Sequence, residues 1–431
     1  MTDQTLQQLP NRPRTLPLNA PVEADRPEAR VGWWAALDKP LVVIVVILLI
    51  IGAGMVYSTT FDWSYQERGS SMSFFLENHA VNMVVGTVGL IFFTLIDYRF
   101  WRRFAIWVLL GTIGALVAVA VFGDTTFGAR RALIGGRFQP GELAAFAVIL
   151  YMAAWLGSNR AKPGSFLYGL LPFGIIVGII GGLLAIQPDL STALIVALIA
   201  LTMYFLAGAV WWHLGTIMAI GMLGGILFVQ IFPYAQERLD NYVSSLSDPT
   251  RASYHTQQAI IAFVNGGWLG KGLGQSTQKI ASLPAPHTDS IFAVIGEELG
   301  VVGASLVVLL YVIFVVRGFQ IARRSVDPFG SLMAIGFTMW VAVQSLLNIA
   351  VMTAVVPASG LPLPFISYGG SSLLMLMCGV GLMLSISRVS TQRRLTDGRR
   401  FLNATYDRSG GNGRPRLSRP DRRPRPLSTE S

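Results

Sequence analysis

Acidic side chains cluster at one boundary between polar and apolar sequence. The segment Pro284–Gly300, PAPHTDSIFAVIGEELG, places His287 and Asp289 directly before a long apolar run, and Glu297 and Glu298 about two helical turns inside it. An ionisable group at membrane depth is costly and is by default a hypothesis for a functional site. Asp289 is the candidate catalytic residue, because a carboxylate at this boundary can act as general base on an incoming hydroxyl.

Each of these residues also has a structural interpretation. Asp289 can cap the helix that follows it, and His287 can be an ordinary loop residue. We expect the two glutamates inside the run to be structural. At least one should pair with arginine or with a polar side chain of the next apolar run, such as Gln344 or Asn348.

Three arginines crowd into a second short segment, GARRALIGGRFQPGELA. Arg130, Arg131 and Arg137 lie there, and Glu142 follows about one turn inside the next apolar run. Guanidinium groups bind phosphates through bidentate, charge-assisted hydrogen bonds, so the segment predicts a site that grips an anion. The alternative is a loop with solvated arginines, to one of which Glu142 is simply paired.

Two further segments contribute candidate substrate-binding residues. Asp189 opens an apolar run in QPDLSTALIV, and the turn Pro357–Ser372 carries Ser367 and Tyr368 before a glycine- and serine-rich helix start. Backbone amides at a helix N-terminus favour anions. Small residues there equally allow close helix packing, so the pattern supports both binding and packing.

The glycine-rich segment GGWLGKGLG, residues 266–274, invites comparison with a nucleotide-binding loop. Lys271 is followed by glycine rather than Ser or Thr, and no strand precedes it, so this interpretation fails. We predict flexible turns instead, in which Lys271 can still help to hold an anion.

The composition indicates the class of protein in which these residues lie. The chain has 431 residues, 52% hydrophobic and 13% charged, against about 25% charged in soluble domains, and its mean hydropathy is +0.54. These values predict a polytopic membrane protein. The net charge of +10 comes from residues that flank apolar runs or lie in the last forty positions, which argues against nucleic acid as a partner. The one cysteine, Cys378, excludes an intrachain disulfide.

Ten apolar runs are long enough to cross about 30 Å of hydrocarbon as helices. Their continuous apolar character favours an all-α fold over a barrel. The runs cover residues 41–57, 79–96, 104–122, 139–157, 166–186, 189–207, 211–232, 290–316, 329–355 and 366–387.

The distribution of Lys and Arg predicts the orientation. A cytoplasmic N-terminus places 25 of the 33 basic residues inside, and ten spans return the C-terminus to the same side. We therefore predict a disordered cytoplasmic tail over 1–39 without a cleaved signal peptide, a ten-helix domain over 40–388 and a second disordered cytoplasmic tail over 389–431. A large extracytoplasmic loop, 233–289, joins helices seven and eight and contains a short amphipathic helix over 256–264.

The candidate residues then share the outer face, where no cytoplasmic nucleotide is at hand. A lipid-linked diphosphate donor satisfies this constraint: the arginines would hold the diphosphate leaving group while Asp289 activates an acceptor hydroxyl. A lipid flippase or transporter and a non-catalytic scaffold are the alternative functions. A transporter should carry its acidic residues near the midplane, on broken helices.

Five motifs, in order, resemble the SEDS family (shape, elongation, division and sporulation), the family of FtsW and RodA. The resemblance covers about residues 40–390 and rests on GARRALIGGRFQPGELA, QPDLSTALIV, YHTQQAIIAFVNGGWLGKGLGQSTQ, HTDSIFAVIGEELG and GLPLPFISYGGSSLL. It implies ten transmembrane helices in the bacterial cytoplasmic membrane. It also implies a peptidoglycan glycosyltransferase that polymerises lipid II in complex with a class B penicillin-binding protein, a transpeptidase, among other division or elongation proteins.

The resemblance also implies residue roles. Asp289 matches the essential aspartate of the family, Arg131 its arginine, with Arg130 beside it, and Glu142 and Asp189 its other two acidic positions. Metal binding by carboxylates that face a diphosphate is compatible with this pattern, with Mg²⁺ or Mn²⁺ as the cation, although no ligand spacing is diagnostic.

The chain departs from the family pattern in its arginine-rich segment. Ala132 stands where the family commonly has tryptophan, Gly141 where it has serine, and Ala145 where it has lysine. Arg137 could replace the missing lysine cation. IGEELG and the segment 327–351 look more like the division-type FtsW than the elongation-type RodA.

Overall fold

A computed structural model describes residues 33–68, 72, 74–126, 129–132, 139–247, 252–281 and 283–410. Arg137, most of the predicted N-terminal tail and residues 411–431 of the predicted C-terminal tail lie outside these ranges. The described chain is helical apart from one short antiparallel ribbon, so the all-α prediction holds with that exception.

The elements follow the predicted apolar runs closely. They are α1 (Trp33–Ala36), α2 (Lys39–Arg68), η1 (Phe75–Ala80), α3 (Val81–Leu95), η2 (Tyr98–Phe104), α4 (Ala105–Phe122), β1 (Asp124–Thr126), β2 (Ala129–Ala132), α5 (Pro140–Leu156), η3 (Phe166–Leu170), α6 (Leu171–Ile186), α7 (Leu190–Leu206), α8 (Trp211–Ile231), α9 (Pro233–Ser247), α10 (Tyr254–Gly266), α11 (Gln278–Ala281), α12 (Ile291–Arg324), α13 (Pro328–Met352) and α14 (Gly370–Gly410).

Eight helical segments among the described residues are long and apolar enough to cross a membrane. Two further apolar helices, α5 and α7, have 17 residues each. Each of the ten predicted runs therefore corresponds to a helix, and the chain is a polytopic membrane protein.

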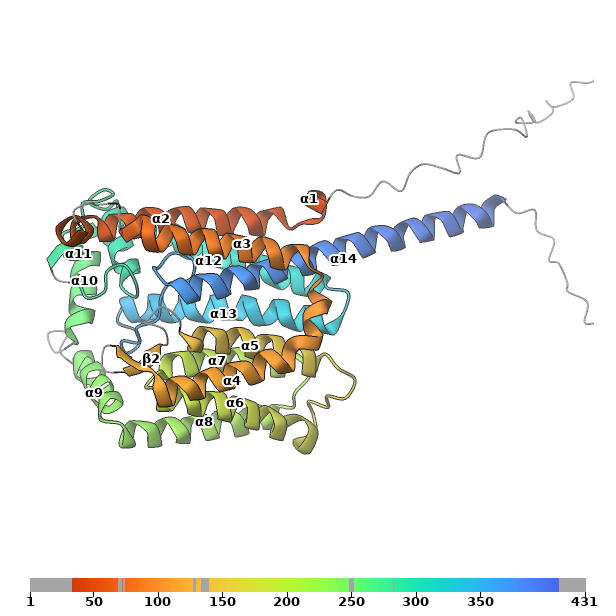
Figure 1. Ribbon diagram of the computed structural model, residues 1–431, viewed down its shortest axis with the longest axis horizontal. Helices are drawn as coiled ribbons and strands as arrows, with labels where there is room; N and C mark the ends of the chain where they lie inside the picture. The colour runs from red at the N-terminus through yellow and green to blue at the C-terminus, as the bar shows by residue number, and fades with distance from the viewer. Residues whose placement is uncertain are drawn as a thin grey trace, which may run out of the picture.

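The long helices form one bundle, with α8 at its edge and with α5, α13 and the first part of α14 deeply buried (Figure 1). We call the end that carries β1–β2 and α9–α11 the loop end. The opposite end, which carries α1, η2 and η3, is the tail end. The predicted amphipathic helix over 256–264 is confirmed as α10, which ends at Gly266 and is followed by Gly267 at the C-cap, as expected for a glycine with positive φ.

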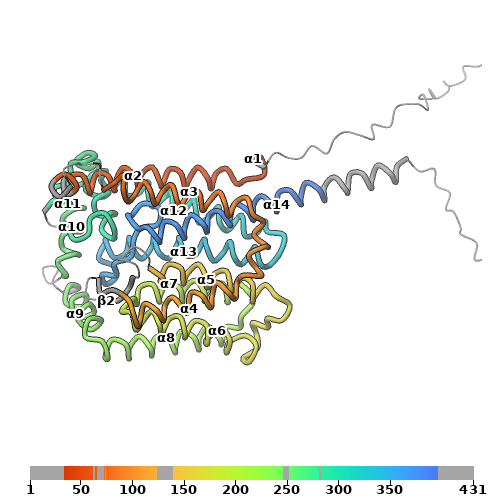
Figure 2. Tube along the Cα trace, viewed as in Figure 1, coloured from red at the N-terminus to blue at the C-terminus, as the bar shows by residue number. Residues whose placement is uncertain are grey.

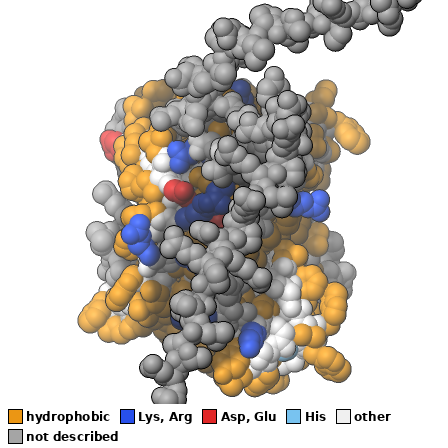
Figure 3. Space-filling view, turned by 90° about the vertical axis from the view of Figure 1, so that its right-hand side faces the viewer, with side chains coloured by type: hydrophobic (Ala, Val, Ile, Leu, Met, Phe, Trp, Pro, Cys, Tyr) orange, Lys and Arg blue, Asp and Glu red, His pale blue; other side chains and the backbone are white. Residues whose placement is uncertain are grey.

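Basic side chains gather at the tail end, as Figure 3 shows. Arg102 and Arg103 lie in the last turn of η2, and Arg323 and Arg324 end α12, where cations are favoured by the helix dipole. Arg99 Nε bonds Asp327 Oδ2 at 2.8 Å, which joins η2 to the start of α13.

The C-terminal tail departs from the prediction of disorder from residue 389. Helix α14 continues beyond the bundle (Figures 1 and 2), and its backbone is helical as far as Gly410. No proline interrupts the chain between Pro364 and Pro415, so nothing in residues 389–410 prevents the helix from continuing.

Helix α12 is broken at Gly300, where φ is 68° and ψ is −171°. The break prevents the usual bonds from Val301 and Val302 to the carbonyls four residues earlier. The glycine-rich segment replaces them: Lys271 N and Gly272 N donate to Glu297 O and Glu298 O, both at 3.0 Å. In return, Val301 N and Val302 N donate to Gly267 O at 2.9 Å and Trp268 O at 3.2 Å.

Residues 266–274 are therefore a docked strap, and the prediction of flexible turns is wrong. Its glycines permit close backbone approach, because a Cβ on Gly266 would lie 2.0 Å from Gly296 O and one on Gly270 would lie 2.2 Å from Glu298 O. A loop that must pair with an exposed helix break at this distance cannot carry side chains at those positions.

Replacing Gly270 by alanine tests this account, with Gly274→Ala as a matched control. Both glycines have positive φ, 79° and 81°, so both variants should lose about 1–2 kcal/mol from the left-handed conformation. Gly274 has open space around its Cβ position. Gly270→Ala should therefore lower the free energy of unfolding, measured by titration with a denaturing detergent, clearly more than Gly274→Ala. Equal losses would contradict the close-approach argument.

Candidate functional site

Asp289 lies half-buried at the loop end, directly before α12. Helix α12 begins at Ile291 with Ser290 at the N-cap position, so Asp289 is not the N-cap residue. Its Oδ1 accepts a hydrogen bond from Thr288 Oγ1 at 2.9 Å, and its backbone carbonyl accepts one from Asn348 Nδ2 at 2.8 Å. The carboxylate therefore has a fixed backbone and a second oxygen available for other contacts.

The turn Pro357–Ser372 closes around this aspartate. Ser367 Oγ donates to Thr288 O and accepts from Leu363 N at 2.7 Å, and Tyr368 N donates to His287 O at 2.8 Å. The rings of His287 and Tyr368 lie 5.8 Å apart. The structure thus brings together four predicted site residues: His287, Asp289, Ser367 and Tyr368.

Glu142 and Asp189 form a second acidic pair, at the N-terminal ends of α5 and α7. Glu142 is buried, lies within hydrogen-bonding reach of Ser372, and is close enough to Asp189 for charge repulsion. Asp189 caps α7, accepting from Thr192 N at 3.4 Å. A Cβ on Gly141 would lie 3.1 Å from Asp189 Oδ2, which explains a small residue at that position.

The same turn connects the two acidic groups. Ser191 Oγ, at the start of α7, donates to Ser359 O at 2.8 Å, and a Cβ on Gly360 would lie 3.7 Å from Asp289 Oδ2. Ser372, at the other end of the turn, reaches Glu142. The turn therefore lies between Asp289 on one side and Asp189 and Glu142 on the other.

The backbone of Arg130 and Arg131 lies in β2, where Arg130 pairs with Thr125 of β1. Strand β2 contacts α4 and α5, at the loop end that also carries Asp289 (Figure 1). The sequence predicted a loop here. Ordering by the ribbon brings both arginine positions to the end of the bundle where the acidic residues lie.

Lys271 belongs to a separate cluster around Glu297. Glu297 is fully buried and accepts from Lys271 Nζ at 2.8 Å, Thr277 Oγ1 at 2.9 Å, Thr277 N and Gln278 N at 3.2 Å, and Ser276 Oγ. Lys271 is thus committed to a carboxylate inside the protein and lies apart from the Asp289 group.

Glu298 has partners that the sequence analysis did not identify. Its Oε1 accepts from Lys279 Nζ at 2.9 Å and from Ser58 Oγ, on α2, at 2.8 Å. The expectation that Gln344 or Asn348 would pair with a glutamate is wrong. Gln344 Nε2 donates to Pro362 O, and Asn348 Nδ2 to Asp289 O and Leu361 O, so both amides hold the turn instead.

The two amides that hold the turn had a detectable sequence signal. Gln344 and Asn348 are four residues apart in an apolar helix, which puts two amides on one face. Lys279 and Ser58 had none, since their pairing with Glu298 joins positions 19 and 240 residues apart.

Two histidines lie beside Asp289. Burial lowers the pKa of both His255 and His287, and the negative charge of Asp289 opposes that shift. His255 Nε2 lies 2.6 Å from Ser290 Oγ. Both imidazoles are therefore neutral at neutral pH, and neither supplies a fixed positive charge to the site.

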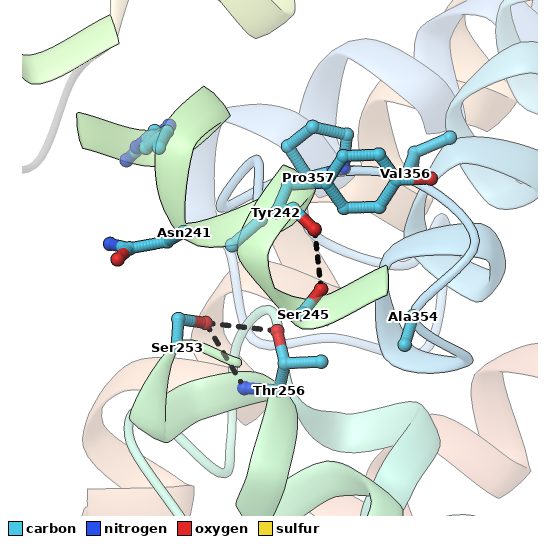
Figure 4. A pocket seen from close by; sticks show the side chains of 10 residues that line it. Asn241, Tyr242, Ser245, Ser253, Thr256, Ala354, Val356 and Pro357 are labelled. Carbon is cyan, nitrogen blue, oxygen red and sulfur yellow. Dashed lines mark hydrogen bonds between the residues drawn. The ribbon is translucent and has the colours of Figure 1, made fainter. Parts of the chain in front are cut away.

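A small pocket of about 40 Å³ lies between α9, α10 and the start of the turn (Figure 4). Ser253 and Thr256, at the N-terminus of α10, share a hydrogen bond there, and Tyr242 Oη donates to Val355 O. The pocket holds at most small molecules such as water. The residues around this pocket join α9 and α10 to the segment that leads into the turn, through the Tyr242–Val355 hydrogen bond and side-chain packing.

The described residues contain no group of three or more His, Cys, Asp or Glu side chains that could hold a metal ion. Glu142 and Asp189 are the nearest approach to such a group beside the turn. A divalent cation at this site therefore stays a prediction.

The fold and site define a class: a multi-pass membrane protein with carboxylates, a polar turn and a basic ribbon gathered at one end of its helical bundle. Comparison with known proteins narrows this class. The profile of the cell cycle protein family of FtsW, RodA and SpoVE matches residues 39–392.

A probable peptidoglycan glycosyltransferase FtsW of Geobacter sulfurreducens is 36% identical over 357 residues, covering 81% of this chain and 95% of the relative. Stage V sporulation protein E of Bacillus subtilis is 35% identical, covering 82% and 97%.

Solved structures agree with the sequence relatives. A chain from a structure on the coordination of polymerization and crosslinking by a peptidoglycan synthase complex superposes with a TM-score of 0.68 at 26% identity, covering 83% of this chain and 99% of that one. The crystal structure of Thermus thermophilus RodA gives 0.61 at 25% identity, covering 82% and 98%. The chain belongs to the FtsW/RodA/SpoVE family, called SEDS above, and is a glycosyltransferase.

Removing the lysine that pairs with each buried glutamate should destabilise the protein to different extents, because Glu297 and Glu298 have different numbers of other hydrogen-bond donors. Among the described residues, Lys279→Met leaves the buried Glu298 with a hydrogen bond from Ser58 alone and should cost about 3–5 kcal/mol of unfolding free energy. Lys271→Met should cost less, because Glu297 keeps hydrogen bonds from Ser276, Thr277 and Gln278. Detergent titration measures both, and Lys279→Met/Glu298→Gln should recover part of the loss. An equal or larger cost for Lys271→Met would contradict this assignment.

Because their pKa values are lowered, His255 and His287 should make the free energy of unfolding decrease at acidic pH. Because folding lowers the pKa of His255 and His287, the unfolded chain binds more protons as pH falls below about 6.5. Their contribution is present above that value and is lost as pH falls through the window between the unfolded and folded pKa. His255→Gln/His287→Gln should flatten the pH dependence of unfolding between pH 6.5 and 5, relative to the wild type. An unchanged slope would contradict the prediction.

Proposed function

We propose that this chain polymerises lipid II into glycan strands, with Asp289 as general base. The observation that supports this proposal most strongly is the half-buried Asp289 carboxylate, whose backbone is fixed by Asn348 and whose second oxygen faces Gly360. The glycine leaves room beside that oxygen for an acceptor hydroxyl.

In the proposed reaction, Asp289 accepts the proton of an acceptor sugar hydroxyl, and the oxygen of that hydroxyl attacks the anomeric carbon of the lipid-linked donor. A new glycosidic bond forms, and the bond from that carbon to the diphosphate breaks with inversion. Undecaprenyl diphosphate leaves with the electron pair of the broken bond. Arg130 and Arg131, at the loop end, would stabilise this leaving group by charge-assisted hydrogen bonds.

The remaining candidates take supporting roles in this proposal. Glu142 and Asp189 shape the far side of the turn, while Ser367 and Tyr368 hold the backbone before Asp289. Arg137 is proposed as a further substrate contact from the sequence alone. If Mg²⁺ or Mn²⁺ takes part, the substrate diphosphate has to supply ligands in addition to these carboxylates.

We further propose ten spans in the bacterial cytoplasmic membrane, with both termini in the cytoplasm. Helices α5 and α7 are each about 25 Å long and lie inside the bundle, so they can complete the count of ten within a hydrocarbon core of about 30 Å. The arginines at the tail end support a cytoplasmic location for that end.

The proposed role is in cell division, with a class B penicillin-binding protein as partner. The division role is supported by relatives named FtsW, for example that of Bacillus subtilis at 36% identity. The partner is supported by the likeness to a chain of a peptidoglycan synthase complex.

Polymerisation of fluorescent lipid II by the purified protein, with and without its transpeptidase partner, tests the proposed function. Asp289→Asn keeps the shape of the side chain but removes the base, so the rate should fall by about 10²–10⁴-fold. Asp240→Asn, an exposed carboxylate on α9, is the matched control and should keep wild-type activity.

Full polymerisation by Asp289→Asn would rule out the base. A wild-type protein that moves lipid headgroups across liposomes without forming glycan would instead indicate a transporter.

A further inference from the structure

A second hollow lies away from Asp289, on the side of the bundle formed by α2. It has a volume of about 770 Å³ and lies between α2, the last two residues of the strap with Lys279 of α11, and Leu299 of α12. Its walls are largely apolar and include Ile50, Ile51, Met55, Phe61, Leu273 and Leu299. We call it the α2 groove. It shares no lining residue with the proposed catalytic site.

The length of the α2 groove matches one leaflet of a bilayer. From Ile50 to Phe61 helix α2 rises about 17 Å, and half of a hydrocarbon core measures about 15 Å. The groove therefore extends from the loop end roughly to the middle of the membrane. At that depth an apolar hollow that protein does not fill is filled by hydrocarbon.

The polar end of the α2 groove is internally paired. Lys279 Nζ donates to Ser58 Oγ, Gly274 O and Glu298 Oε1, at 2.8, 2.8 and 2.9 Å. These three acceptors use all three protons of the ammonium group. The Lys279–Glu298 pair has no net charge, so the groove offers no unpaired cation to a diphosphate.

These features select among the membrane components that could occupy the α2 groove. Over the same 17 Å, a transmembrane helix with its side chains occupies roughly 1,300–1,900 Å³, about twice the volume of the hollow. A diphosphate-linked lipid would need cations that Lys279 cannot supply. A phospholipid needs only the apolar walls, because its headgroup stays in the interface and its acyl chain enters the groove.

We propose that the α2 groove binds an acyl chain of a bilayer phospholipid in the leaflet at the loop end. The bound chain fills the space between α2 and Leu299, one residue before the Gly300 break. It thereby supports the junction at which α2, the strap and α12 meet through Ser58, Lys279 and Glu298.

Gly54 allows a direct test, because it lines the α2 groove and a Cβ at this position has no heavy atom within 4 Å. Gly54→Leu should place a side chain where the acyl chain lies, without a clash and with a gain in helix propensity. Gly111→Leu on α4 is the matched control: Gly111 is also exposed and helical, with open space at its Cβ position, and lies outside the groove.

Native mass spectrometry of the purified protein in detergent should show at least one retained phospholipid on the wild type and on Gly111→Leu. Gly54→Leu should retain one fewer. Equal retention by all three proteins would overturn the proposal. So would a retained lipid with the mass of a polyprenyl diphosphate, or a loss of a co-purifying membrane protein instead of lipid from Gly54→Leu.

A measurement on the wild type covers the case in which Gly54→Leu does not fold. The protein is reconstituted in phosphatidylcholine vesicles that contain a phospholipid with a photoreactive group on its acyl chain. Cross-links above the level of other lipid-facing helices are expected in the peptides with residues 50–61 and 273–279. Labelling of these peptides no stronger than that of α8, which is exposed along its length, would overturn the proposal.

Discussion

The requirement that backbone groups at membrane depth find hydrogen-bond partners dominates this structure. The break at Gly300 in α12 displaces two amides and two carbonyls from the helical pattern, and residues 267–272 take all four as partners. This exchange fixes the strap and thereby α10, which packs on α12. It also orients the first half of α12, where Asp289 precedes the helix and the two buried glutamates follow.

The turn Pro357–Ser372 has a comparable role at the candidate site. It carries no charged side chain, yet it reaches His287, Thr288, Glu142 and the start of α7 through backbone and hydroxyl contacts. The side-chain amides of Gln344 and Asn348, on α13, donate hydrogen bonds to its backbone carbonyls. The acidic residues are therefore positioned relative to one another by an uncharged segment.

The acidic residues of the loop end differ in burial and in whether a lysine pairs with them. Glu297 and Glu298 are fully buried and paired with lysines, as expected of carboxylates that stabilise structure. Asp289 is half-buried, and the neutral histidines beside it do not compensate its charge. This contrast separates the proposed base from the two glutamates, eight and nine residues further along the chain.

The sequence by itself determined the membrane class, ten apolar helices, the amphipathic α10 and the candidate residues, because hydrophobic period and residue type are local properties. It also identified the family, because five motifs occur in order. Only the tertiary structure decided that GGWLGKGLG closes a helix break, that Lys279 and Ser58 pair with Glu298, and that β2 orders the backbone of Arg130 and Arg131. These features depend on contacts between residues far apart in the chain, and no local pattern encodes which distant group will satisfy a buried charge or a displaced amide.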